Sequence, residues 1–159
     1  MPAMPVPEKF VDLIATVTAA IDGKPVEPPL ADFLNQQFPP GGGVFEAIQT
    51  LCRQGCAEGW LCAREAEGIK FGRPVKAGER THGFSVDVVE MQDIIGPHHR
   101  HPRGEIDMVM PFDETAKFDG TPRGWKVYGP NSAHRPAVAG GRALVLYLLP
   151  QGEIEFTRG

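Results

Sequence analysis

Residues 99–105 of this chain read HRHPRGE, and this stretch decides how the rest of the sequence is interpreted. His99 and His101 are two positions apart, so on a β-strand both imidazoles lie on the same face. Glu105 has the same parity and joins them if the chain stays extended in between. His134, on a later strand, can then complete a set of three nitrogen ligands and one oxygen ligand.

Imidazole and carboxylate ligands together suit a borderline divalent cation, namely Fe, Mn, Co, Ni or Zn. The pattern therefore predicts a site for one divalent ion, with the ligands His99, His101, Glu105 and His134. Such a site leaves coordination positions open, as catalysis requires. We therefore interpret the chain as a metal-dependent enzyme.

Two further histidines are not expected among the ligands. His98 has even parity and points to the opposite face of the strand, and His82 lies in a Thr-His-Gly turn.

Composition and charge are typical of an ordinary globular protein of one domain, with 42% hydrophobic and 23% charged residues among 159. A net charge of −4 argues against nucleic acid or an anionic membrane as a partner. No apolar run approaches the ~20 residues of a transmembrane helix, and Met1–Phe10 lacks the apolar core of a signal peptide. We expect a cytoplasmic protein, in which Cys52, Cys56 and Cys62 are free thiols.

The first 58 residues have helical periodicity. Apolar residues recur at spacings of three and four from Phe10 to Ile21, which predicts a first helix that ends at Gly23. A second short helix is expected around Leu30–Leu34, and a third around Val44–Cys52. We expect residues 1–58 to form a helical extension that packs on the following domain or on a second subunit.

From residue 59 to 159 the pattern changes to short β-segments separated by Gly and Pro. The expected strands are Trp60–Ala66, Lys70–Val75, Phe84–Ile95, Glu105–Pro111, Gly124–Gly129, Arg142–Pro150 and Glu153–Thr157. The run Ala143–Leu149 is apolar at every position, so we expect a central strand that is covered on both faces. This many short strands in about 100 residues predicts a β-sandwich or barrel.

Two segments resemble the motifs of the cupin superfamily. HHRHPRGEIDMVMP resembles the first motif, with His99, His101 and Glu105 at the HxH-x3-E spacing, and GPNSAHRPAV resembles the second, with His134 as its single histidine. Asn131 stands where the second motif usually has Gly, and Asn tolerates the left-handed conformation that Gly supplies. The resemblance, which covers about residues 84–150, implies a mainly β, jelly-roll barrel.

The whole chain, helical extension included, is similar to a narrower cupin group, the 4-hydroxylaminobenzoate lyases. The similarity extends through GPHHRHPRGEIDMVMP and DGTPRGWKVYGPNSAHRPAVAGGRALVLYLLPQGEIEF. It implies conversion of 4-hydroxylaminobenzoate to 3,4-dihydroxybenzoate (protocatechuate) with release of ammonium, a step in nitrobenzoate degradation.

Such a reaction needs a proton-transfer group. Parity places Asp107 on the same face as Glu105, so Asp107 is the first candidate, ahead of Glu90 and Asp93 on the preceding strand.

A benzoate substrate also needs a cation for its carboxylate, for which the planar guanidinium of arginine is well suited. Seven arginines are candidates: Arg64, Arg73, Arg80, Arg100, Arg103, Arg123 and Arg135. Arg73 is preferred, because the sequence FGRP would present it at the rim of a barrel. Five residues could supply apolar walls for the ring: Trp60, Trp125, Tyr128, Phe84 and Met91.

Other functions share the same ligands and the same fold. One alternative is an Fe(II)-dependent cupin dioxygenase that attacks an aromatic substrate, and oxygen dependence would distinguish it. A cupin isomerase or decarboxylase would be separated by its products, and a non-catalytic cupin that binds a small molecule or sugar would show no turnover. We also expect a homodimer.

Overall fold

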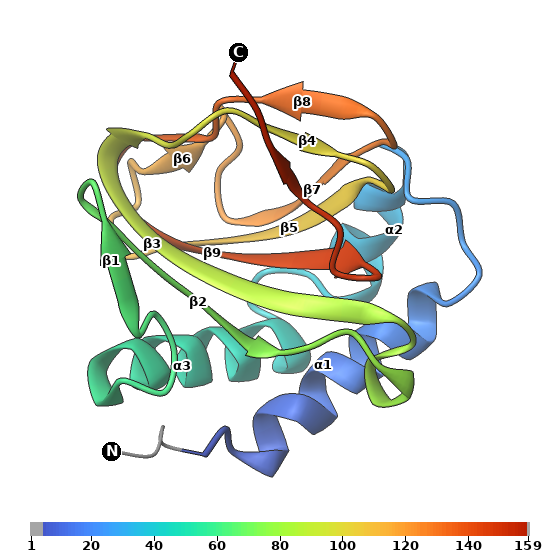
Figure 1. Ribbon diagram of the computed structural model, residues 1–159. Helices are drawn as coiled ribbons and strands as arrows, with labels where there is room; N and C mark the ends of the chain where they lie inside the picture. The colour runs from blue at the N-terminus through green and yellow to red at the C-terminus, as the bar shows by residue number, and fades with distance from the viewer. Residues whose placement is uncertain (1–4, 159) are drawn as a thin grey trace.

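The computed structural model describes residues 5–158, which form two facing β-sheets and three helices (Figure 1). Residues 1–4 and 159 lie outside this range. Residues 1–4 are the start of the predicted helical extension and of the segment that lacks the apolar core of a signal peptide. The helices come first in the chain: α1 (Glu8–Ile21), α2 (Leu30–Gln37) and α3 (Gly43–Glu58). The strands follow: β1 (Arg64–Ala66), β2 (Ile69–Val75), β3 (Phe84–Ile95), β4 (His99–His101), β5 (Glu105–Pro111), β6 (Lys117–Phe118), β7 (Gly124–Tyr128), β8 (Ser132–His134), β9 (Ala137–Pro150) and β10 (Glu155–Phe156).

The two sheets differ in size. The larger has the strand order β1-β2-β3-β9-β5-β7, with β6 also pairing with β9, and the smaller has the order β10-β4-β8. Every pairing is antiparallel. The smaller sheet lies across the concave face of the larger one (Figure 1). Sheets that face each other in this way pack their inward side chains between them. The predicted mainly β, jelly-roll barrel with three N-terminal helices is confirmed.

Strand β9 is the centre of the larger sheet and is buried on both faces, as the sequence predicted. Its even-numbered residues, such as Leu146, belong to the hydrophobic core that the three helices share with the outer face of the sheet. Its odd-numbered residues, such as Val145, belong to a second core inside the barrel. Side chains alternate along a strand, so one strand contributes to both cores.

The helices pack against the outer face of the larger sheet, with α1 and α3 lying beneath it in the view shown (Figure 1). The rings of Phe45 and Trp125 meet edge to face at 6.1 Å, and the Trp125 indole N–H donates a hydrogen bond to the carbonyl of Phe38 at 2.9 Å. The apolar faces of the helices are therefore covered within the same chain.

Several strand boundaries differ from those predicted. The strand expected from Trp60 begins only at Arg64, because the chain first turns at Gly59 (φ 92°) and packs Trp60 and Leu61 into the helical core. Strand β9 begins five residues earlier than expected, at Ala137 rather than Arg142, and continues through the Gly140-Gly141 pair, where both residues have positive φ. The last strand is limited to Glu155–Phe156, and β6 was not expected. The strands expected to carry the histidines are the short β4 and β8, whose ranges were not among those predicted.

The chain does not stay extended between His101 and Glu105. The N–H of Gly104 donates to the carbonyl of His101 at 3.2 Å, and Gly104 adopts φ 91°, so the chain turns from the smaller sheet into the larger one. Glu105 therefore reaches the histidines from the opposite sheet, and not along one strand as the sequence had suggested.

Among residues 5–158, none of the helices combines the length and the apolar character that crossing a membrane requires.

Candidate metal centre

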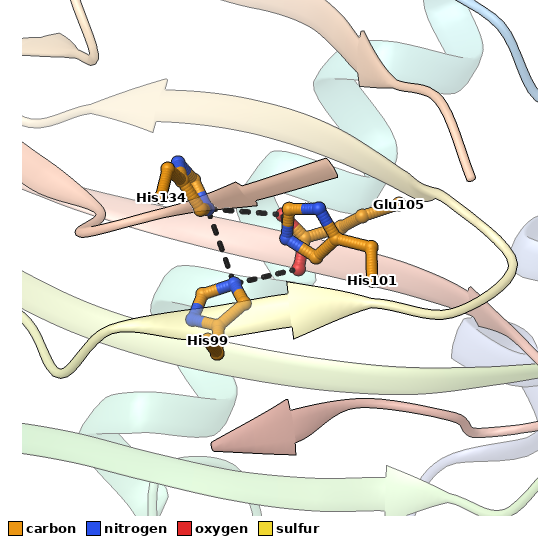
Figure 2. A group of neighbouring side chains, drawn as sticks. All are labelled: His99, His101, Glu105 and His134. Atoms are coloured by element: carbon orange, nitrogen blue, oxygen red, sulfur yellow. Dashed lines mark hydrogen bonds and ion pairs between the residues drawn. The ribbon is translucent and has the colours of Figure 1, made fainter. Parts of the chain in front are cut away.

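The four predicted ligands meet inside the barrel, between the two sheets (Figure 2). His99 and His101 lie on β4, and His134 lies opposite His99 on the paired strand β8. Glu105 projects from β5 in the larger sheet. One ligand atom from each residue falls within a group whose members all lie within 4.8 Å of one another.

The separations within this group are those of atoms around a common centre. Nε2 of His134 lies 3.1 Å from Nε2 of His99, and the Glu105 carboxylate lies 3.5 Å from His99 and 3.2 Å from His101. Ligands about 2.1 Å from one ion are separated by roughly 3 to 4 Å. The four residues therefore fit a single divalent cation.

Hydrogen bonds orient the His134 ring. Its Nδ1 lies 2.7 Å from Oδ2 of Asp119, whose carboxylate also accepts hydrogen bonds from the Tyr128 hydroxyl and from the N–H of Ala137. An ionised carboxylate only accepts, so Nδ1 carries the proton and Nε2 presents its lone pair to the centre. Burial alone would raise the pKa of Asp119, but the bonds from His134 and Tyr128 outweigh burial and lower the pKa.

A second pair of hydrogen bonds shows which ring nitrogen of His101 carries the proton. Its Nδ1 lies 2.8 Å from the Ser132 hydroxyl, which donates its only hydrogen to the carbonyl of Gly129 at 2.6 Å. The hydroxyl must therefore accept from Nδ1–H, which leaves a lone pair on Nε2.

Several polar atoms at the centre lack the partners that burial normally demands. Nε2 of His101 and both carboxylate oxygens of Glu105 are buried and have no hydrogen-bond partner. Both residues have no exposed surface. Lone pairs on nitrogen and on carboxylate oxygen point toward one another at 3.2 Å, an arrangement that is stable only with a positive charge between them. The donor set and its orphaned atoms fit a divalent metal ion.

Asp107 lies two residues beyond Glu105 on the same face of β5, as parity predicted. It has no exposed surface, and both of its carboxylate oxygens lack a hydrogen-bond partner. Burial, reinforced by the neighbouring charge of Glu105, raises the pKa of Asp107. Asp107 does not line the cavity that extends from the metal centre.

A cavity of about 800 Å³ extends from the metal centre toward the β1–β2 edge of the barrel. His99 is the only one of the four ligands that lines it. Most of the wall is apolar, and the polar side chains on it include Arg73, Asp87 and Tyr147. A cavity of this size, largely apolar with a few polar groups, is typical of a site for a small organic molecule.

The cavity separates the seven candidate arginines. Only Arg64 and Arg73 line it. The Nε and Nη2 atoms of Arg73 donate to the two carboxylate oxygens of Asp87 at 2.8 and 3.0 Å, and Nη2 also donates to the carbonyl of Gly152. Four of the others contact groups elsewhere, and these are Arg80, Arg100, Arg103 and Arg123.

The remaining candidates are divided in the same way. Trp60 and Met91 line the cavity, whereas Trp125 and Phe84 belong to the helical core, and the ring of Tyr128 packs beside His134 at 4.4 Å. The two weaker candidates for proton transfer lie away from the ligand group: Glu90 pairs with Arg142, and Asp93 accepts from the N–H groups of Gly140 and Gly141. The two histidines that were not expected among the ligands also have other partners: His98 contacts Thr157, and His82 contacts Thr18.

Sequence reasoning missed four residues that shape the site. Asp119 and Ser132 orient two of the predicted metal ligands, His134 and His101, and Asp87 and Tyr147 face the cavity. The period-two pattern of β3 carried a weak signal for Asp87, because Asp87 has the parity of the half-buried Val89 and of the buried Met91. Nothing in the spacing of Asp119 or Ser132 indicated their contacts.

Facing antiparallel sheets that enclose an HxH-x3-E motif and a later single histidine define a cupin. Two solved structures show a partial likeness. An RmlC-like cupin protein from Ralstonia eutropha JMP134 is 13% identical, with a TM-score of 0.44 over 60% of this chain and 64% of that chain. Oxalate oxidase in complex with glycolate is 22% identical, with a TM-score of 0.45 over 58% and 57%.

Two proteins named 4-hydroxylaminobenzoate lyase are similar over nearly their whole length. The one from Nocardioides sp. (strain LMS-CY) is 31% identical over 96% of both chains, and the one from Pseudomonas putida is 29% identical over 94% of both. The family model described as 4-hydroxylaminobenzoate lyase (PnbB) matches residues 12–156. The chain belongs to this family of lyases, as the sequence resemblance indicated.

Asp119→Asn is expected to weaken the binding of a divalent ion about 10- to 100-fold, because an amide no longer holds His134 in the ligating tautomer. Asn tolerates the left-handed backbone that Asp119 adopts (φ 48°), so the fold should persist. The measurement is a titration with Zn²⁺ against a chromophoric chelator. Asp93→Asn is the matched control, since Asp93 is also left-handed (φ 43°) and accepts backbone hydrogen bonds away from the ligands. Equal affinities in the two variants would contradict the role of Asp119.

Proposed function

We propose that this protein converts 4-hydroxylaminobenzoate to 3,4-dihydroxybenzoate and ammonium, with a divalent metal ion held by His99, His101, Glu105 and His134. The observation that carries the proposal is the buried group of four ligand atoms beside an organic-sized cavity, in a chain that belongs to a lyase family. The overall reaction is hydrolytic, because one water is consumed and neither an oxidant nor a reductant is required.

The chemistry sets specific demands on the site. The N–O bond of the hydroxylamine must break with its electron pair leaving on oxygen, water must add to the adjacent ring carbon, and the nitrogen must leave as ammonia. A bound divalent ion would supply a Lewis acid for the negative charge that develops on oxygen. The protein orients its ligands through Asp119 and Ser132, so that little reorganisation is needed during the reaction.

Asp107 is proposed to act on Glu105 and not directly on the substrate. It lies beside Glu105 in the interior but outside the cavity wall. In its protonated form Asp107 can donate a hydrogen bond to the Glu105 carboxylate, which fixes the orientation of that ligand. Asp107 is thus proposed as a positioning residue, which differs from the proton-transfer role that the sequence predicted.

Arg73 is proposed to bind the carboxylate of the substrate. Its Nε and Nη2 atoms are held by Asp87 and Gly152, and these contacts leave Nη1 to bind an anion in the cavity. Arg64, at the same cavity wall, adds positive charge. An aromatic ring can then lie with its carboxylate toward Arg73 and its hydroxylamine toward His99.

The first test is an anaerobic incubation of the metal-loaded protein with 4-hydroxylaminobenzoate, in which 3,4-dihydroxybenzoate and ammonium are followed together. We expect the two products in equal amounts and at the same rate with and without O2. Removal of the metal with a chelator should abolish turnover, and a divalent ion should restore it. A requirement for O2 would instead support the dioxygenase, other products an isomerase or decarboxylase, and binding without turnover a non-catalytic cupin.

Arg73→Met is expected to raise KM for 4-hydroxylaminobenzoate about 10- to 100-fold, the effect of losing a hydrogen bond to a charged group. Phenylhydroxylamine, which lacks the carboxylate, should discriminate little between the variant and the wild type. The loss of Arg73 also leaves Asp87 unpaired, so the double variant Arg73→Met/Asp87→Asn serves as the control. Equal losses on both compounds would show that Arg73 does not bind the carboxylate.

We also propose that the protein is a homodimer. Two large apolar side chains, Ile95 and Phe156, are 67% and 65% exposed at the rim of the barrel, where a second subunit would cover them. Light scattering is expected to give twice the chain mass of 17.3 kDa, and a mass of one chain would contradict the dimer.

A further inference from the structure

Tyr147 is a buried polar residue that the metal centre does not use. It lies on the interior face of β9, is 6% exposed, and lines the cavity. Within residues 5–158 its hydroxyl has no hydrogen-bond partner. Buried tyrosine hydroxyls normally find a partner, so an unpaired donor at a cavity wall indicates a partner that arrives with a ligand.

Tyr147 lies near both His99 and the residue that binds Arg73. Tyr147 pairs across strands with Asp87, which in turn holds Arg73. On the other side its ring lies 6.5 Å from the ring of His99. Tyr147 therefore lies between the metal ligands and the proposed carboxylate site.

We propose that the Tyr147 hydroxyl donates a hydrogen bond to the hydroxylamine oxygen of the substrate and is a catalytic residue. This inference rests on the proposed function, because it places the carboxylate of a para-substituted benzoate at Arg73. Tyr147 and Arg73 lie on β9 and β2, two strands apart and therefore roughly 10 Å apart along the sheet. A benzoate ring fits that span, which brings its para substituent to Tyr147.

The contact strengthens as the N–O bond breaks. Both bonding electrons leave with the oxygen, so negative charge builds on the atom that Tyr147 contacts. A hydrogen bond to that charge is stronger than one to the neutral hydroxylamine, and the interaction therefore lowers the barrier more than it stabilises the bound substrate. The departing hydroxide takes the proton released when water adds to the ring. This forms one water. A second water then replaces the nitrogen, which leaves as ammonia, so the net reaction consumes one water.

The test compares Tyr147→Phe with the wild type. We expect kcat to fall about 100-fold or more, while KM and the metal content change little, because Phe keeps the ring and removes only the unpaired hydroxyl. The thermal midpoint should not fall. Tyr128→Phe is the matched control variant. Tyr128 is the only other tyrosine of the chain, and its hydroxyl donates to Asp119. Loss of that hydroxyl should weaken metal binding instead.

A binding measurement keeps the inference testable without turnover. Wild-type protein should bind 4-hydroxybenzoate, which carries an oxygen at the para position, several-fold more tightly than benzoate, and Tyr147→Phe should bind the two equally.

The possible outcomes separate the inference from the proposed function. A wild type without lyase turnover overturns the proposed function, and the binding comparison then decides on Tyr147. The inference is overturned if Tyr147→Phe keeps more than half of the wild-type kcat, if the variant still prefers 4-hydroxybenzoate, or if it loses its fold or its metal.

Discussion

A carboxylate with no exposed surface, that of Glu105, lies among three imidazoles in the interior of the barrel. Removing such a charge from water is costly unless an opposite charge compensates it. The surrounding residues leave that compensation to a cation, because the lone pairs of His101 and His134 are turned toward the carboxylate by Ser132 and Asp119. The organisation of the interior follows from this one requirement.

The fold meets the requirement by bringing ligands from two sheets together. The smaller sheet supplies the histidines in register, and the larger sheet supplies Glu105 after the turn at Gly104. The helices cover the outer face of the larger sheet, so β9 can be apolar on that face while its interior face presents Tyr147 toward the cavity. The same strand thus belongs to the hydrophobic core on one side and to the proposed active site on the other.

The sequence predicted which four side chains come together, because their identity and spacing are local: HxH-x3-E and a later histidine remain recognisable without a structure. The bounds of β3 and β5 and the left-handed Asn131 (φ 67°) were also predicted correctly. Contacts between distant strands were not predictable. Parity placed Asp107 on the interior face, but only the register of β5, β9 and β3 shows that Asp87 and Tyr147 line the cavity while Asp107 does not.

The three histidines and Glu105 are proposed to form one metal site. The most direct measurement is an anomalous difference map from a crystal of the protein loaded with one equivalent of Co²⁺ or Zn²⁺. We expect a single peak about 2.0–2.2 Å from the three Nε2 atoms and from the Glu105 carboxylate. A peak elsewhere on the molecule, with none among these four residues, would contradict it.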